Sequence, residues 1–195
     1  METRTRVVLL MHPKEYRYQK CTTGRLLCLH LENSEIISGV YFDDNARVRR
    51  LIEDPANSPV LLYPGKDALS VAAISASSLG GRRLVVFLID GTWHCARTIA
   101  RKNPLLLGLP RLMIHPASPS RFTIKRQPAP WCLSTLEAAH ELLLGLEACG
   151  LESYPDKERL IGAFNAMQDF QVTQIARAAA SARHSVRGVR EPLLP

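Results

Sequence analysis

The sequence predicts an α/β domain, in which a parallel sheet is flanked by helices and an additional helix follows at the C-terminus. The main observation is that short apolar runs typical of strands alternate along the chain with longer stretches typical of helices. Strands that are joined through helices form parallel sheets with right-handed crossovers. The second observation is the length of 195 residues, which suits one domain.

Five strand-like segments and four helix-like segments can be placed in order. The run at residues 84–89 is the clearest strand, because six consecutive apolar residues indicate burial on both faces of a sheet. The other strand-like segments are residues 6–11, 35–40, 60–63 and 111–115. The helix-like segments are residues 23–31, 45–53, 92–102 and 134–145.

The pattern changes after Gly150. Residues 156–182 show no strand signal and are rich in alanine, so we expect one long or broken helix that packs on the domain. Residues 183–195 are basic and end in proline, which favours a loose tail. The expected organisation is a main domain of residues 1–150 and, packed on it, a helical extension with a basic tail of residues 151–195. The apolar residues at roughly helical spacing in this extension are Leu160, Phe164, Met167, Val172 and Ile175.

The net charge of +7 is concentrated in one part of the chain. Between residues 82 and 131, nine basic residues accompany a single acid, Asp90. A localised positive field attracts polyanions, and nucleic acid is the commonest such partner. The alternative is solubilising charge that has no specific partner.

Composition also bears on compartment and metal content. No apolar run approaches the roughly 18 residues that cross a bilayer, and nothing resembles a signal peptide, so we expect a cytoplasmic protein without a membrane partner. The five cysteines are scattered without any C-x-x-C pair, which favours reduced thiols and predicts no zinc site.

The segment Asp90-Gly91-Thr92-Trp93 joins the clearest strand to the helix that follows it. In an open parallel sheet, ligands bind in the crevice beyond the carboxyl ends of the strands. A carboxylate and a tryptophan at that edge therefore predict a ligand site. A structural alternative stays open, in which Asp90 caps the helix and Trp93 belongs to the core.

Basic residues accompany two of the expected helices. Arg97 and Arg101 lie four residues apart, with Lys102 adjacent, so one helix face can clamp a phosphate backbone. Arg17 and Arg25 accompany the expected helix at residues 23–31, whose start can be capped by Thr23 and can hold an anion. The alternative for this second pair is an ordinary connection between a strand and a helix.

Two further segments are suited to binding. Tyr63-Pro64-Gly65 ends a strand in a tight turn, where glycine lets a ligand approach the backbone, although most such pairs are only turns. Ser134 and Glu137 have the spacing of a capping box, which explains both residues without a ligand. The amides of that helix start are also a binding surface once the preceding basic loop folds over it.

Several short motifs follow one another along the chain, namely His12-Pro13-x-Glu15 with Thr23-Gly24-Arg25, Tyr63-Pro64-Gly65, Asp90-x-Thr92-Trp93 with Ala96-Arg97, Asn103-Pro104, and Leu133-Ser134-Thr135-Leu136-Glu137-Ala138. In order and spacing, these motifs resemble the DTW-domain family over residues 10–146. The family is related to SPOUT-type methyltransferases, so the resemblance implies a SPOUT-like parallel sheet whose C-terminal part forms a trefoil knot.

The resemblance implies a transferase that moves the 3-amino-3-carboxypropyl group of S-adenosylmethionine onto N3 of a uridine in transfer RNA. S-adenosylmethionine is then the donor substrate, tRNA the partner, and residues 1–150 the catalytic domain. The implied catalytic residues are Asp90, Thr92 and Trp93. The implied cofactor-binding residues are Tyr63, Pro64, Gly65, Asp90, Leu133, Ser134 and Thr135. The implied RNA-binding residues are Arg17, Arg25, Arg97, Arg101, Lys102, Lys125 and Arg126.

Several alternatives stay open within this hypothesis. Asp90 is expected either as the general base for the N3 proton or as the group that orients the ammonium of the donor. A SPOUT-like RNA methyltransferase and a tRNA-binding protein without catalysis are the competing functions. Many bacterial relatives resemble zinc-ribbon proteins ahead of the His-Pro segment, whereas here the eleven residues before His12 include no cysteine, so no metal is expected.

Overall fold

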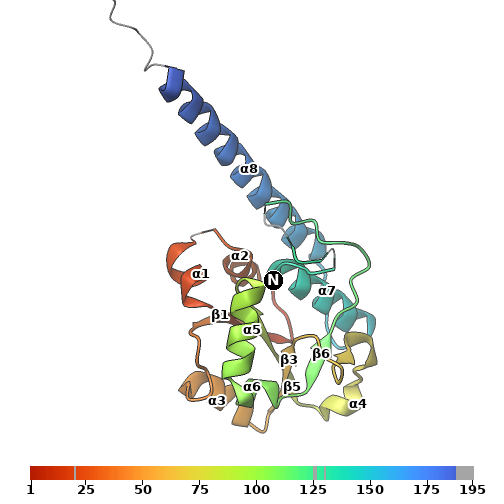
Figure 1. Ribbon diagram of the computed structural model, residues 1–195. Coiled ribbons are helices and arrows are strands. Elements are labelled where there is room, and N and C mark those ends of the chain that lie inside the picture. The colour runs from red at the N-terminus through yellow and green to blue at the C-terminus, as the bar shows by residue number, and fades with distance from the viewer. Residues whose placement is uncertain (20, 125–126, 130, 188–195) are drawn as a thin grey trace, which may run out of the picture.

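A parallel sheet forms the centre of the protein. The computed structural model describes residues 1–19, 21–124, 127–129 and 131–187, with side chains described as far as Ala179. Within these residues the sheet has six strands in the order β2-β1-β5-β3-β6-β4 (Figure 1). All neighbouring strands are parallel. The strands are β1 (Arg6–Met11), β2 (Ser34–Ser38), β3 (Asn57–Leu62), β4 (Leu69–Ser70), β5 (Arg83–Asp90) and β6 (Arg111–Met113).

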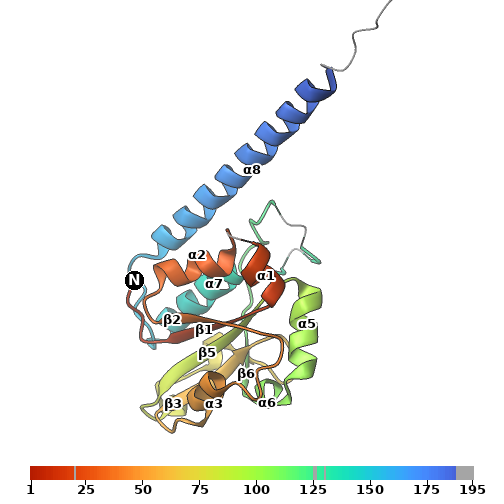
Figure 2. The same cartoon turned by 90° about the vertical axis from the view of Figure 1, so that its left-hand side faces the viewer.

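Helices cover both faces of this sheet. α2 (Thr23–His30), α7 (Thr135–Ala148) and the first part of α8 (Lys157–Arg187) pack on one face. α3 (Ala46–Glu53), α5 (Trp93–Lys102) and α6 (Pro104–Leu107) pack on the other (Figure 2). The remaining helical segments are α1 (Pro13–Tyr18), α4 (Ala76–Leu79) and a 3₁₀ turn at Val71–Ala73.

The central strand shows why the sheet is covered on both sides. Successive side chains of a strand point to opposite faces. Leu84, Val86 and Leu88 belong to the core beneath α2 and α7, whereas Val85 and Phe87 belong to the core beneath α3 and α5. A continuous apolar run is therefore needed here, and the predicted parallel sheet is confirmed.

The predicted strands and helices all occur, with ends that differ by a few residues. The predicted strand at residues 35–40 is β2 (Ser34–Ser38), and the predicted strand at 60–63 begins earlier, as β3 (Asn57–Leu62). The short elements α1, α4, α6 and β4 were not predicted, because two to six residues are too few to show a period.

The C-terminal helix packs on the domain only over its first part. Leu160 and Phe164 are fully buried, as expected. Val172 and Ile175 are 51% and 60% exposed, so the expectation that they pack on the domain was wrong. Figures 1 and 2 show the reason, because beyond its first turns α8 runs away from the sheet and its helices.

The expected loose tail was also partly wrong. α8 continues to Arg187, so residues 183–187 are helical and not a tail. Alanine has the highest helix propensity of all residues, and the alanine-rich stretch before residue 183 favours continuation of the helix. The rest of the expected tail, residues 188–195, lies outside the described residues.

Candidate active site

The carboxyl ends of the central strands meet at one edge of the sheet. Met11 of β1 pairs in register with Asp90 of β5, and the His12 amide donates a hydrogen bond to the Asp90 carbonyl at 2.9 Å. A cavity of about 780 Å³ lies at this edge. Its size falls within the range of roughly 300–1,000 Å³ that is usual for small-molecule sites.

The cavity is built from segments that are far apart in the sequence. The residues that follow β1, β3, β5 and β6 contribute to its wall, together with the start of α7. Met167 and Gln171 of α8 also line it, so residues beyond 150 belong to the site. Most of the wall is apolar, and a few polar side chains converge on it, an arrangement typical of ligand pockets.

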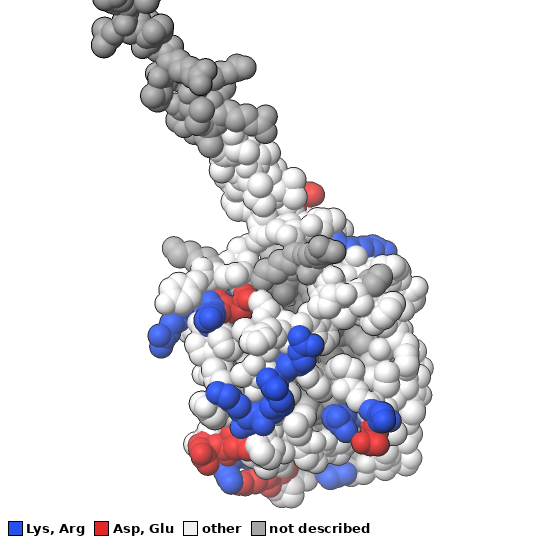
Figure 3. All heavy atoms as spheres, in the orientation of Figure 1, with Lys and Arg blue, Asp and Glu red and all other residues white. Residues whose placement is uncertain are grey.

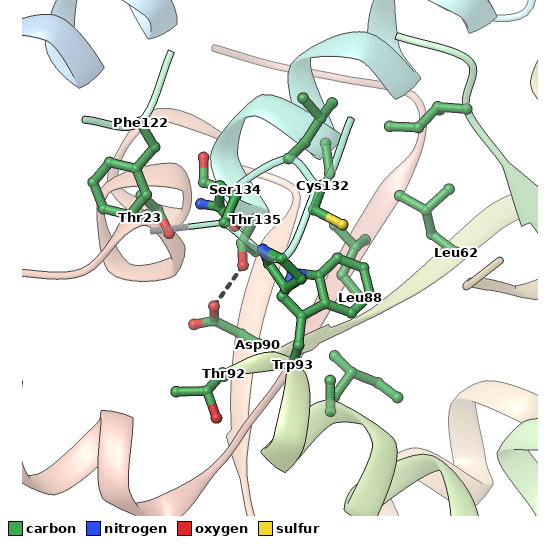
Figure 4. A pocket seen from close by; sticks show the side chains of 18 of the residues that line it. Thr23, Leu62, Leu88, Asp90, Thr92, Trp93, Phe122, Cys132, Ser134 and Thr135 are labelled. Atoms are coloured by element: carbon green, nitrogen blue, oxygen red, sulfur yellow. Dashed lines mark hydrogen bonds between the residues drawn. The ribbon is translucent and has the colours of Figure 1, made fainter. Parts of the chain in front are cut away.

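Asp90 is the last residue of β5 and is only 6% exposed. The hydroxyl of Thr135 donates a hydrogen bond of 2.6 Å to Asp90 Oδ1 (Figure 4). Oδ2 lies against the Cα of Gly24, where any Cβ would overlap with it. The carboxylate is therefore held between the starts of α7 and α2.

The structural alternative for Asp90 and Trp93 was wrong. The cap of α5 is Thr92, whose hydroxyl accepts a hydrogen bond from the Cys95 amide at 3.3 Å. Trp93 is half-buried, belongs to neither hydrophobic core, and lines the cavity. Figure 4 shows Trp93 beside Cys132 and Thr135, with the Thr92 side chain directed away from Asp90. Asp90, Thr92 and Trp93 thus all line the cavity, and the Thr92 hydroxyl also caps α5.

The structure brings most of the expected cofactor-binding residues to the cavity. Tyr63 and Pro64 line it after β3, and Leu133, Ser134 and Thr135 line it at the start of α7. Gly65 is absent from the described wall. Its Cα lies against the guanidinium of Arg111, with which any added Cβ would overlap.

The predicted capping box at the start of α7 is confirmed. Ser134 Oγ accepts from the Glu137 amide at 3.4 Å, and the Glu137 carboxylate accepts from the Ser134 amide at 2.9 Å. The same carboxylate accepts from the Ser120 hydroxyl at 2.8 Å and from the Arg121 amide at 2.6 Å. It therefore also fixes the loop that crosses the cavity before α7.

Sequence reasoning named the His-Pro motif but missed the role of Glu15 in the cavity. Glu15 of α1 is a second buried carboxylate in the wall. α1 begins with Pro13 and is capped by His12, whose Nδ1 accepts from the Lys14 amide at 3.2 Å. Burial, with a contribution from Lys14, lowers the pKa of His12, which favours the neutral ring that can accept this bond. The sequence signal that could have placed Glu15 at the site is its position in a helix that begins directly after a strand.

The cap of α2 also differs from expectation. Thr22 is the cap, and its hydroxyl accepts from the Arg25 amide at 3.2 Å, so the helix begins at Thr23. The Arg25 guanidinium donates to the Tyr16 carbonyl at 2.6 Å and lies 4.7 Å from the centre of the Tyr16 ring. Arg25 therefore joins α2 to α1.

Those of the expected RNA-binding residues that the structure describes lie outside the cavity wall. Arg17, Arg97 and Arg101 are exposed. Lys102 donates to the Tyr41 hydroxyl at 2.8 Å and lies over the Tyr41 ring. Figure 3 shows lysine and arginine side chains gathered over α5, the helix that begins at the cavity with Trp93. Lys125 and Arg126 lie outside the described residues.

Neither a metal centre nor a membrane span was found in the described part of the chain. Its His, Cys, Asp and Glu side chains form no group of three or more that could hold a metal ion. None of its helices combines the length and apolar character needed to cross a membrane.

The profile of the DTW domain matches residues 1–172. A Drosophila melanogaster protein named tRNA-uridine aminocarboxypropyltransferase 2 is 33% identical over 149 residues, which cover 74% of this chain and 57% of that protein. Proteins of the same name from Macaca fascicularis and Mus musculus are 26% identical over 184 and 188 residues. These two alignments cover 94% and 96% of this chain, but 60% and 61% of the relatives. The chain therefore spans about three fifths of the length of these relatives. No solved structure matches the chain.

Proposed function

The chain belongs to the DTW-domain family, and we propose that it transfers the 3-amino-3-carboxypropyl group of S-adenosylmethionine to N3 of a uridine in tRNA. The names of the relatives support this activity. The observation that carries the proposal is the buried Asp90 carboxylate, held by Thr135 in a largely apolar cavity at the carboxyl edge of a parallel sheet. Ligands of open α/β sheets bind at this edge.

The residues around the cavity fit the donor. Its volume of about 780 Å³ suits a nucleoside joined to an amino acid. We assign Tyr63 and Pro64, with Leu133, Ser134 and Thr135, to binding of its adenosine and methionine parts. Trp93 offers an aromatic face for a stacked base or for a cation–π contact with the sulfonium, and base stacking contributes about 1–3 kcal/mol.

The transfer reaction sets two requirements that the protein must meet. S-adenosylmethionine supplies a methylene activated by its sulfonium, so that N3 bonds to this carbon while the carbon–sulfur bond breaks and leaves its electron pair on sulfur. The N3 proton must leave, and the reacting atoms must be held in line. Asp90 can receive this proton or can hold the ammonium of the donor, and Thr135 fixes the orientation of its carboxylate in either case.

The two roles of Asp90 are separable by kinetics. If Asp90 is the base, Asp90→Asn lowers kcat and leaves the KM for the donor nearly unchanged. If it holds the ammonium, the same change mainly raises the KM for the donor, because an amide binds a cation poorly. Circular dichroism of Asp90→Asn provides the control for folding.

The exposed face of α5 supports RNA as the acceptor. Arg97 and Arg101 lie one helical turn apart on a helix whose first residue lines the cavity. Phosphates bound along α5 would bring the RNA backbone past the cavity mouth. We therefore assign Arg97 and Arg101, with Arg17, to the RNA-binding surface.

A labelled donor tests the proposed activity directly. We expect purified protein to transfer label from the carboxypropyl part of S-adenosylmethionine to uridine-containing tRNA, and Asp90→Asn to lose most of this transfer. Transfer of a labelled methyl group instead would replace the proposal with a SPOUT-like RNA methyltransferase. Binding of tRNA without affinity for the donor in calorimetry would leave a non-catalytic tRNA-binding protein.

We also propose that the fold is SPOUT-like, with a trefoil knot in its C-terminal part. The family relationship supports this topology, as does the parallel sheet in which α7 follows β6 through a long connection. The chain path in an experimental density map tests it, because an unknotted path from β6 to α7 would rule the knot out.

A further inference from the structure

An exposed tryptophan stands at the mouth of the cavity. Trp131 lines the cavity and is nevertheless 70% exposed. It lies in a turn that is closed by a hydrogen bond of 2.9 Å from the Cys132 amide to the Ala129 carbonyl. Phe122, on the same connection, instead packs against Phe164 of α8, with ring centres 5.6 Å apart. Packing against α8 therefore explains the aromatic side chain of Phe122. The larger Trp131 ring instead faces solvent.

Two other exposed aromatic residues directly precede residues of the cavity wall in the sequence. Tyr18, at the end of α1, is 80% exposed and precedes Gln19, and Phe170 of α8 is 59% exposed and precedes Gln171. Of these three exposed aromatic residues, Trp131 is the one that lines the cavity itself.

The connection that carries Trp131 is held at its base. The Gln168 side chain of α8 accepts from the Thr123 amide at 2.8 Å and from the Thr123 hydroxyl at 3.1 Å. Glu137 holds the preceding residues, Ser120 and Arg121, from the side of α7. Gln171 reaches the opposite wall and donates to the Cys21 carbonyl at 3.3 Å. α7 and α8 therefore hold the segments on either side of the mouth, which limits the entropy lost when a ligand binds.

The chemistry of the acceptor indicates which ligand group Trp131 contacts. N3 of uridine carries the hydrogen that uridine donates in a base pair, so a paired uridine cannot accept a carbon substituent there. The target must be unpaired and must leave its stack to enter the cavity. Its neighbours are then bases with exposed faces, and aromatic side chains bind such faces without regard to sequence.

We infer that Trp131 stacks on a base that flanks an unpaired target uridine. The inference rests on the proposed function in taking RNA as the partner. It deepens that proposal by naming the form of the substrate, a single-stranded segment whose target base leaves the stack. Trp131 binds a flanking base, while the cationic face of α5 binds the backbone.

Fluorescence and affinity together test this inference. The chain has two tryptophans, so Trp93→Phe leaves Trp131 as the only tryptophan. A uridine-containing single strand should quench its fluorescence, and a duplex of the same sequence should not. Trp131→Ala, in the otherwise wild-type chain, should weaken binding of the single strand about 5- to 150-fold, the equivalent of one stacked base. Trp131→Phe should retain most of the affinity, and Leu29→Ala, which removes an exposed apolar side chain of α2, should bind normally.

Two outcomes would overturn the inference. One is wild-type affinity of Trp131→Ala for the single strand, with unquenched Trp131 fluorescence. The other is a change in oligomeric state of Trp131→Ala by ultracentrifugation without a change in RNA binding, which would make Trp131 part of a contact between protein chains. Failure of the proposed function is a different result, namely quenching and selective binding of single strands without transfer of the carboxypropyl label.

Discussion

The hydroxyl of Thr135 donates a 2.6 Å hydrogen bond to Oδ1 of Asp90, and this bond joins the end of β5 to the start of α7. Thr135 is the first residue of α7, directly after the capping residue Ser134. Glu137 completes the cap and holds the loop above it. The orientation of the Asp90 carboxylate therefore depends on the first residue of a helix, which lies 45 residues away along the chain.

Thr135→Val tests this dependence, because valine keeps the shape of threonine without its hydroxyl. We expect transfer activity to fall about tenfold or more, and the free energy of unfolding to fall by about 1 kcal/mol, the usual value of one hydrogen bond. Steady-state kinetics and urea unfolding measure the two effects. Thr135→Ser keeps the donor and serves as the control; equal activity of the Val and Ser variants would show that this bond does not orient Asp90.

Gly24→Ala tests the other side of the carboxylate. A Cβ at Gly24 would overlap with Asp90 Oδ2 and come close to the Met11 side chain, so we expect destabilisation of about 1–3 kcal/mol. Helix propensity alone would favour alanine by about 1 kcal/mol. Gly162→Ala in α8 is the matched control, because open space surrounds that position and the change should stabilise. Thermal unfolding of both variants is the measurement, and a stabilised Gly24→Ala would contradict the contact.

Glu35 gives the protein a predictable pH dependence. Burial raises the pKa of this carboxyl, but hydrogen bonds from Arg47 and Arg6 outweigh burial, so the pKa is lowered. Its contribution to stability is present above its ordinary pKa of about 4.3, and is lost as the pH falls through the folded value. In urea titrations from pH 7 to 3, the stability difference between wild type and Glu35→Gln should shrink below the ordinary pKa. A stability difference between the two proteins that does not change with pH would exclude this contribution of Glu35.

The sequence predicts best those parts of the site that depend on local pattern. The apolar run of β5 and the segment after it place Asp90 at the sheet edge, and the Ser134 capping box needs only residues three apart. Gly65 was assigned to the site because its turn follows a strand, but its nearest side-chain neighbour is Arg111, which is far along the chain and cannot be identified from the local pattern. Gln168 and Gln171 could not be found in this way, because their contacts are set by the path of α8 across the domain.

Gln168→Ala should loosen the connection that carries Trp131. It removes the acceptor for the Thr123 amide and hydroxyl, at an expected loss of about 1–2 kcal/mol. Hydrogen–deuterium exchange should become faster at residues 119–124, with little change in the central strands. Thr173→Ala is the control, because its hydroxyl donates only to the Asp169 carbonyl within α8. Unchanged exchange at residues 119–124 would mean that α8 does not hold this connection.

The charge on α5 can be tested by the salt dependence of tRNA binding. Each phosphate contact adds about 0.7–0.9 to the slope of log affinity against log salt concentration. The double variant Arg97→Ala/Arg101→Ala should therefore reduce the magnitude of this slope by about 1.4–1.8, and should bind more weakly at low salt. Arg49→Ala/Arg50→Ala on α3 removes the same charge from another exposed helix, and should change the slope little. If both double variants shift the slope equally, net charge attracts the RNA and α5 does not hold it specifically.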